Sequence, residues 1–143
     1  MRRVNRSALV PYSAEQMYAL VEDVVAYPTF LPWCTATTLH SKDANTIEAS
    51  LELQKSGVTK SFRTRNSLHP GVAMGIALVG GPFRHLQGGW RFDQLGKDGS
   101  KVSLALEFEF ESFMTDILFG HYFEETCNSL VDSFTRRAHD IYG

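Results

Sequence analysis

The sequence predicts an α+β fold in which a curved antiparallel sheet of about seven strands wraps around one long C-terminal helix, in the order β-α(α)-β6-α. The closing segment, residues 113–142, carries apolar side chains at helical spacing on one broad face. Six strand patterns joined by short turns precede it, which indicates an antiparallel meander. A helix with an apolar face and a large sheet must bury those faces against each other.

The composition predicts one domain spanning residues 1–143. The chain is 43% hydrophobic and 21% charged, which is ordinary for a folded domain. A net charge of −2 provides no general basic field, so we expect no DNA partner. Two cysteines make no disulfide framework, and no run is long enough for a signal peptide or a membrane span. We therefore expect a cytoplasmic protein.

The first strand is expected at residues 2–10. The sequence does not decide which side of this strand faces the core, because basic and apolar residues alternate in the same phase: Arg2, Val4, Arg6, Ala8 and Val10. A helix follows, with Ser13 and Gln16 spaced for a capping box. It should end by Tyr27, because Pro28 disfavours helix in the residue before it. The next residues have room for at most one more turn of helix.

Six further strands are expected, at residues 33–41, 46–55, 58–69, 72–79, 84–95 and 102–111. Alternation of apolar and polar residues is clearest in 46–55 and 102–111. Glycines are the expected points at which the sheet bends around the helix: Gly75, Gly80, Gly81, Gly88 and Gly89.

The closing helix should present two apolar rows to the sheet. The main row is Phe119, Phe123, Cys127, Leu130, Phe134, Ala138 and Ile141. The second row is Ile117, Leu118, Tyr122 and Val131. Ser112 or Thr115 can cap its start. About thirty residues of helix would extend about 45 Å, long enough to cross the whole sheet.

Three stretches resemble one known family. Residues 27–34, YPTFLPWC, look like its Y-x-x-F-L-P-W-C segment. Residues 81–92, GPFRHLQGGWRF, look like its G-P-F-x-x-L-x-G-x-W-x-F segment. Its end resembles residues 108–112, 123–125 and 134–138, which read FEFES, FEE and FTRRA. The chain thus resembles the START-like superfamily, whose fold is the helix-grip, and within it the coenzyme Q-binding protein and ribosome-association toxin (RatA) family.

This resemblance implies a binding protein rather than an enzyme. The implied ligand is ubiquinone or another polyprenyl quinone or lipid, held between sheet and helix to support respiration or quinone synthesis. No other cofactor is implied, and transient peripheral contact with the inner membrane would suit such a ligand. An alternative is a toxin that binds the large ribosomal subunit and blocks subunit joining. A third reading is a polyketide cyclase-like enzyme.

Aromatic residues are the candidate ligand-binding set: Phe30, Trp33, Phe62, Trp90, Phe92, Phe108, Phe119 and Phe123. Pockets for apolar ligands have such walls and volumes of ~300–1,000 Å³. The indoles of Trp33 and Trp90 and the hydroxyl of Tyr122 could donate to quinone carbonyls. A polyprenyl tail would leave through an end of the grip, with residues 27–34 as a rim. The alternative is that the aromatics simply pack as core.

The sequence gives less support to a metal site, a reactive thiol or an RNA-binding surface. The histidines and cysteines lack metal-ligand spacing. Cys127 falls in the buried stripe, where a thiol is inert. Five basic residues could form a patch on the sheet: Lys60, Arg63, Arg65, Arg84 and Arg91. Arg63, Arg65 and Arg91 could face the Glu-rich last strand and take part in cross-strand charge pairing, or the patch could be an RNA footprint.

Overall fold

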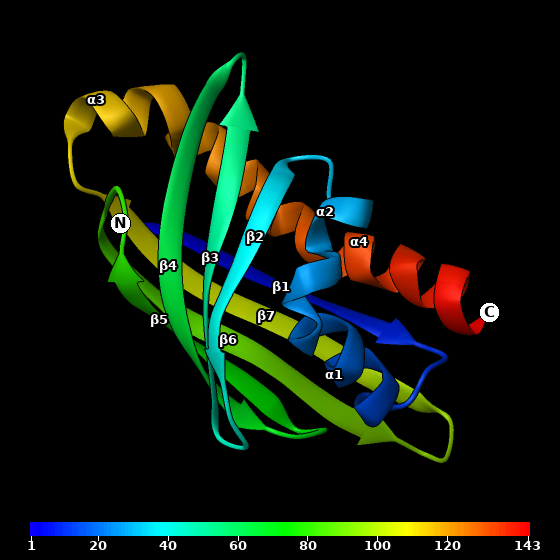
Figure 1. Ribbon diagram of the computed structural model, residues 1–143. Helices are drawn as coiled ribbons and strands as arrows, with labels where there is room; N and C mark the ends of the chain where they lie inside the picture. Colours follow the sequence, from blue (N-terminus) through cyan, green and yellow to red (C-terminus); the bar gives the residue numbers. More distant parts are fainter.

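The computed structural model describes all 143 residues and has the expected α+β helix-grip architecture. Seven strands form one antiparallel sheet in the order β1-β7-β6-β5-β4-β3-β2. The strands are β1 (Arg2–Val10), β2 (Cys34–Lys42), β3 (Thr46–Lys55), β4 (Val58–His69), β5 (Ala73–Gly80), β6 (Phe83–Leu95) and β7 (Gly99–Phe110). Figure 1 shows the long closing helix lying along the curve of this sheet. The seven strands predicted from alternation are therefore confirmed, with ends displaced by a few residues at most.

The helices lie at the two ends of the meander. They are α1 (Ala14–Glu22), a 3-10 turn η1 (Val24–Ala26), α2 (Tyr27–Phe30), α3 (Phe113–Thr115), a π-helical turn η2 (Asp116–Gly120) and α4 (His121–Tyr142). The capping box is confirmed: Gln16 N donates to Ser13 Oγ over 3.1 Å, and Ser13 N donates to Gln16 Oε1 over 2.9 Å. The predicted single turn near Pro28 is α2, where proline stands in the first turn and needs no N–H partner.

Tertiary contacts decide the facing of β1. Val4 and Val10 are buried in the core. Arg2 and Arg6, in the same phase, reach past this edge strand to the closing helical segment. Arg2 Nε donates to Asp116 Oδ1 over 3.0 Å, and Arg6 Nε donates to Asn128 Oδ1 over 3.0 Å. Long basic side chains can share a face with core valines because their charged ends extend beyond it.

Two of the glycines at which bends were expected, Gly80 and Gly88, lie at backbone irregularities of the sheet. The pairing of β4 with β5 shifts register between Arg63 and Thr64, where Arg63 is opposite Gly80. Gly88 has φ +152°, and a Cβ there would lie 2.0 Å from the carbonyl oxygen of Ala105. Only glycine permits this approach of β6 to β7.

The closing segment is helical from residue 113 to residue 142, but it is not one regular α-helix. The π-helical turn changes the phase of the side chains that precede α4. Ile117 and Leu118 consequently face solvent, so their assignment to the buried stripe was wrong. Ile141 is also exposed, near the end of the chain. The rest of the main row is buried or half-buried as expected, and Val131 is buried.

Candidate functional site

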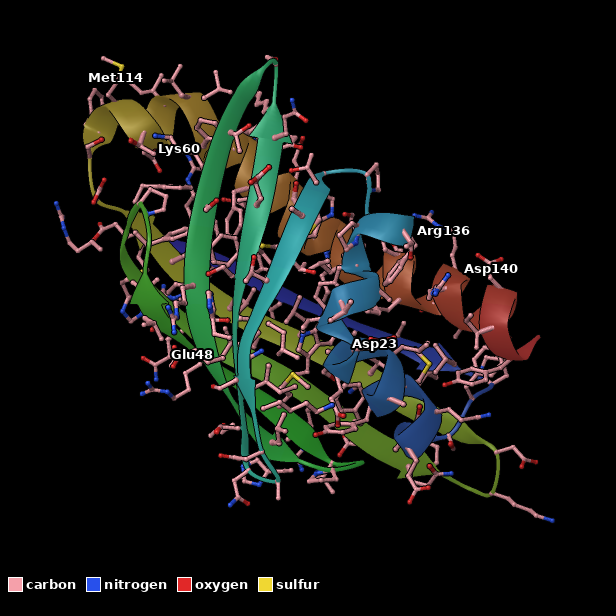
Figure 2. All side chains as sticks on the ribbon, in the orientation of Figure 1. Asp23, Glu48, Lys60, Met114, Arg136 and Asp140 are labelled. Carbon is pink, nitrogen blue, oxygen red and sulfur yellow. The ribbon has the colours of Figure 1, made fainter.

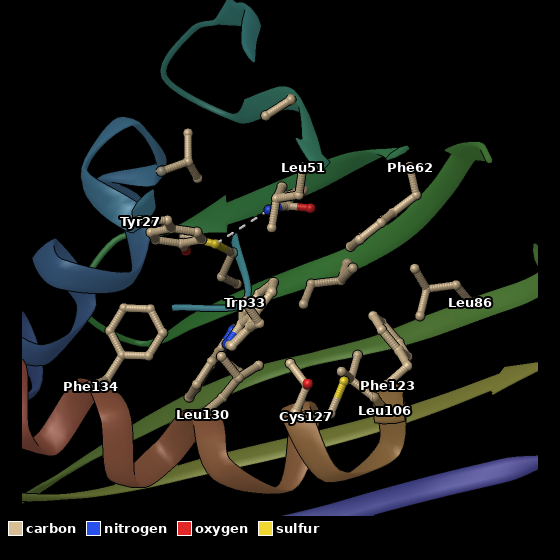
Figure 3. Close-up of a pocket in the computed structure, with 17 residues that line it drawn as sticks. Tyr27, Trp33, Leu51, Phe62, Leu86, Leu106, Phe123, Cys127, Leu130 and Phe134 are labelled. Atoms are coloured by element: carbon tan, nitrogen blue, oxygen red, sulfur yellow. Dashed lines mark hydrogen bonds between the residues drawn. The ribbon is translucent and has the colours of Figure 1, made fainter. Parts of the chain in front are cut away.

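A cavity of about 80 Å³ lies between the concave face of the sheet and α4. It has 17 lining residues, of which 15 are hydrophobic, and they come from the α1–β2 connection, from β3 to β7 and from α4 (Figure 3). The volume is below the ~300–1,000 Å³ that is usual for ligand pockets. A ligand larger than a few waters therefore requires part of the wall to move outward.

The sequence-predicted aromatics divide into two groups. Trp33, Phe62, Trp90 and Phe123 line the cavity. The other four do not: Phe30, Phe92, Phe108 and Phe119. Strand alternation and helical spacing placed six of the eight aromatics on core-facing sides of the sheet and the helix, and all six are buried. The core extends beyond the cavity, so not all of them line it.

Each of the four displaced aromatics has another packing partner or place. The ring of Phe30 lies 5.3 Å from that of Phe134, and the guanidinium of Arg137 lies 4.9 Å from the Phe30 ring centre. Phe92 packs against Tyr18, with ring centres 5.7 Å apart. Phe119 is buried in the turn before α4. Phe108 belongs to the aromatic group described next.

Five phenylalanine rings close one end of the cavity. This phenylalanine cluster consists of Phe62, Phe83, Phe108, Phe110 and Phe123. Phe123 of α4 is its centre, with its ring 4.8 Å from Phe108 and 5.2 Å from Phe83. At the other end, Phe134 packs edge-on against Trp90 at 5.3 Å. Between these two contacts, Cys127 and Leu130 of α4 face open space (Figure 3).

The two edges of the grip are closed differently. On the β1 side, Arg2 and Arg6 bind the helical segment. On the β3 side, the Tyr122 hydroxyl donates to the Gln54 carbonyl over 2.9 Å. This bond uses the hydroxyl proton, so the prediction that Tyr122 donates to a ligand was wrong. Next to this hydrogen bond, the cavity wall consists of the half-buried side chains of Trp33, Leu51 and Leu130. This is the thinnest part of the wall.

Two polar atoms in the lining have no hydrogen-bond partner. They are Trp33 Nε1, a donor, and Asn66 Oδ1, an acceptor. The amide nitrogen of Asn66 donates to the sulfur of Met74 over 3.7 Å, and Asn66 is only 8% exposed. Sequence analysis missed Asn66. The available signal was a polar residue in the same phase as Phe62 and Leu68, two apolar residues of the same strand.

The titratable groups in the lining are Tyr27 and Cys127, and both stay neutral at physiological pH. Burial raises the pKa of the Tyr27 hydroxyl and of the Cys127 thiol well above their usual values. The Tyr27 hydroxyl also donates to the Val21 carbonyl. The second thiol, Cys34, is buried too, and burial raises its pKa to about 11. No cluster of three or more His, Cys, Asp or Glu side chains could hold a metal ion.

The basic residues of the sheet are mostly paired with acids. Arg63 and Arg65 both bind Glu48 of the neighbouring strand, with Arg65 Nη2 2.8 Å from Glu48 Oε1. These guanidinium groups hold the pKa of Glu48 below its usual value. Arg91 pairs with Asp93, and Arg84 lies 3.5 Å from Glu109. Cross-strand and local pairing thus explains most of this group, while Lys60 forms no such pair. Arg63, Arg65 and Arg91 have partners on β3 and β6, so the expectation that they pair with the Glu-rich last strand was wrong.

Comparison with known proteins agrees with this fold. Residues 10–135 match the family described as "Polyketide cyclase / dehydrase and lipid transport". The chain belongs to this family, the START-like class that its motifs resemble. A START superfamily protein from Mycobacterium smegmatis has the same fold, with a TM-score of 0.68 at 20% identity over 91% of this chain and 97% of that one.

Two relatives carry the two protein names of the family that the sequence resembles. The chain is 47% identical to the ribosome association toxin RatA of Vibrio cholerae, over 100% of this chain and 99% of that protein. It is 30% identical to the mitochondrial coenzyme Q-binding protein COQ10 homolog B of Xenopus laevis, over 97% of this chain and 59% of that protein.

Proposed function

We propose that the protein binds ubiquinone or another polyprenyl quinone or lipid between the sheet and α4, in support of respiration or quinone synthesis. The observation that carries this proposal is the cavity, whose lining is 15 hydrophobic residues out of 17 and includes an unpaired indole donor. A quinone head is flat and apolar and has carbonyl acceptors, so it matches aliphatic and aromatic walls with a donor among them. The name of the COQ10 relative supports the same ligand class.

Loading requires a larger cavity than the 80 Å³ present. The wall that can yield is the half-buried set of Trp33, Leu51 and Leu130, because these side chains have solvent on one side. Trp33 belongs to the segment YPTFLPWC, so a polyprenyl tail that leaves past Trp33 would have this segment as its rim.

The lining supports binding without catalysis. General acid–base work needs a group with a pKa near the operating pH. The thiol and hydroxyl of the lining have pKa values raised away from neutrality, and no carboxylate or histidine is among the lining residues. The cyclase reading is supported by the family description and has no support from the residues of the lining.

Solvent extraction of the gently purified protein, followed by mass spectrometry, tests the proposal. We expect a quinone or related lipid in the extract and a higher melting temperature on adding a short-tailed ubiquinone. The matched control is Leu130→Trp, which narrows the cavity and should abolish both signals. An empty extract together with an unchanged melting temperature would contradict the proposal.

We also propose that the loaded protein touches anionic membranes through an apolar ridge, defined as Phe113, Met114, Ile117 and Leu118. Phe113 is 81% exposed and Met114 is 63% exposed. Lys55 donates to the Leu118 carbonyl over 3.3 Å, which places a cation at the ridge. Figure 2 shows Met114 projecting outward from this segment. Exposed apolar groups beside a lysine that forms no ion pair suit an anionic bilayer surface. No helix here is long and apolar enough to span a membrane.

Vesicle flotation tests the ridge. The protein should float with vesicles that contain anionic phosphatidylglycerol, and Phe113→Ser with Ile117→Ser should abolish flotation. Val72 is an exposed apolar residue in the β4–β5 turn, so Val72→Ser is the control variant and should still float with the vesicles. Equal flotation of all three proteins would remove the proposal.

Association with the large ribosomal subunit, which would block subunit joining, is the second candidate. The full-length 47% identity to a protein named ribosome association toxin RatA favours it. Overexpression should then lower the fraction of joined ribosomes, and the protein should cofractionate with large subunits. Normal sedimentation profiles would exclude this candidate without bearing on the cavity.

A further inference from the structure

We propose that the cavity prefers a hydroxyl-bearing ligand head, and thus the reduced quinol over the oxidised quinone. This inference rests on the proposed function, that the cavity holds a ligand of the quinone class. It adds the redox form of that ligand, and it assigns the preference to Asn66, acting with Trp33.

Asn66 supplies the acceptor. It lines the cavity from β4 and is 8% exposed, and its Oδ1 has no partner. A buried acceptor without a donor is unfavourable, so a ligand that brings a donor gains affinity. A quinol has O–H donors, whereas a quinone has only carbonyl acceptors. A carbonyl placed at Asn66 would set oxygen lone pairs against each other.

Met74 holds the amide in this orientation. Asn66 Nδ2 donates to the sulfur of Met74 over 3.7 Å, inside the lining of the same cavity. Rotation of the amide by half a turn would present its N–H groups to a quinone. It would also lose the N–H···S contact and place the amide oxygen beside the sulfur lone pairs. The orientation that suits a quinol is therefore the one the protein stabilises.

Trp33 supplies the complementary donor. Its Nε1 is buried without a partner, and in Figure 3 the indole lies on the side of the cavity toward α4. A hydroxyl oxygen accepts from an indole N–H as well as a carbonyl oxygen does, so Trp33 serves both redox forms. Two hydroxyls also belong to the lining. That of Tyr27 already donates to a backbone carbonyl, and that of Thr126 can donate or accept, so it serves both redox forms. Discrimination between the forms therefore rests on Asn66.

Anaerobic titration of the intact protein with short-tailed ubiquinol and with the matching ubiquinone tests the inference, with tryptophan fluorescence as the readout. We expect the quinol to bind at least fivefold more tightly. Asn66→Leu should bring the ratio of the two dissociation constants close to one. Thr64→Val, at a buried polar residue of the same strand that is not among the lining residues, is the matched control and should keep the ratio.

A second variant covers the case in which Asn66→Leu does not fold. Met74→Leu keeps the volume and removes the sulfur acceptor, which frees the amide to rotate. It should also bring the ratio toward one while Asn66 is present. Equal or tighter binding of the quinone by the unmodified protein would overturn the inference and leave the proposed function intact. A ratio unchanged in both variants would overturn the role of Asn66. Binding of neither form would overturn the inference together with the proposed function.

Discussion

Two neighbouring stretches of one helix face show opposite behaviour. Around Phe123, α4 packs against the phenylalanine cluster, which closes one end of the cavity. One to two turns later, around Cys127 and Leu130, the same face borders a cavity. Both stretches are apolar, so hydrophobicity does not distinguish a filled core from a site. The second stretch borders a cavity whose lining holds two unpaired polar atoms, on Trp33 and Asn66. Open space together with unsatisfied polarity thus marks the site, because the Tyr18 hydroxyl is also unpaired but lies outside the lining.

Removing a ring from the phenylalanine cluster should give the largest effect. Phe108 is 0% exposed, so Phe108→Ala should lower the free energy of unfolding by about 3–5 kcal/mol, measured by urea denaturation. Phe113→Ala, at an exposed site, should change it by less than about 0.5 kcal/mol. A loss below 1 kcal/mol in Phe108→Ala would mean that the cluster is no tighter than the cavity side.

Filling the cavity should affect binding far more than stability. Leu130 is half-buried at the thin wall, so Leu130→Trp should weaken binding of a short-tailed ubiquinone at least tenfold, which is about 1.4 kcal/mol. Ile141→Trp, on an exposed part of the same helix, should leave the affinity unchanged. Unaltered binding in Leu130→Trp would place the ligand elsewhere.

One tyrosine hydrogen bond holds each end of α4, and removing them one at a time distinguishes an effect on stability from an effect on ligand exchange. Tyr122 donates to the Gln54 carbonyl over 2.9 Å beside the thin wall, and Tyr142 donates to the Gln16 carbonyl over 3.1 Å at the far end. Each Tyr→Phe change should cost about 0.5–1.5 kcal/mol of unfolding free energy. Only Tyr122→Phe should speed ligand release in stopped-flow fluorescence. Equal release rates in the two variants would argue against entry on the β3 side.

The ion pair at the β1 edge should give the smallest effect. Hydrogen bonding to Arg2 lowers the pKa of Asp116. A lowered folded-state pKa stabilises the protein above the unfolded-state value, about 3.8, and this stabilisation is lost as pH falls through the lower folded-state value. Asp116→Asn should therefore cost less than about 1 kcal/mol at pH 7, because the pair is partly exposed, and should flatten the acid limb of a stability–pH curve. An acid limb identical to that of the unmodified protein would show that the pair contributes nothing.

The sequence by itself determined the strand phases, the capping box at Ser13 and the family resemblance. These depend on local alternation, on local hydrogen bonds and on contiguous motifs, all of which are written in neighbouring residues. Half of the predicted aromatic set lines the cavity, because alternation identifies a face but not the position along it.

Only the tertiary structure decided the rest. The facing of β1 depends on where Arg2 and Arg6 find partners more than a hundred residues away. Ile117 and Leu118 are exposed because of a π-helical turn, which the apolar pattern of the sequence does not predict. The cavity is the space left where side chains from distant strands and α4 fail to meet. Its acceptor, Asn66, becomes visible only when the partners of every buried polar atom are counted, because satisfaction of a polar group is a property of its surroundings.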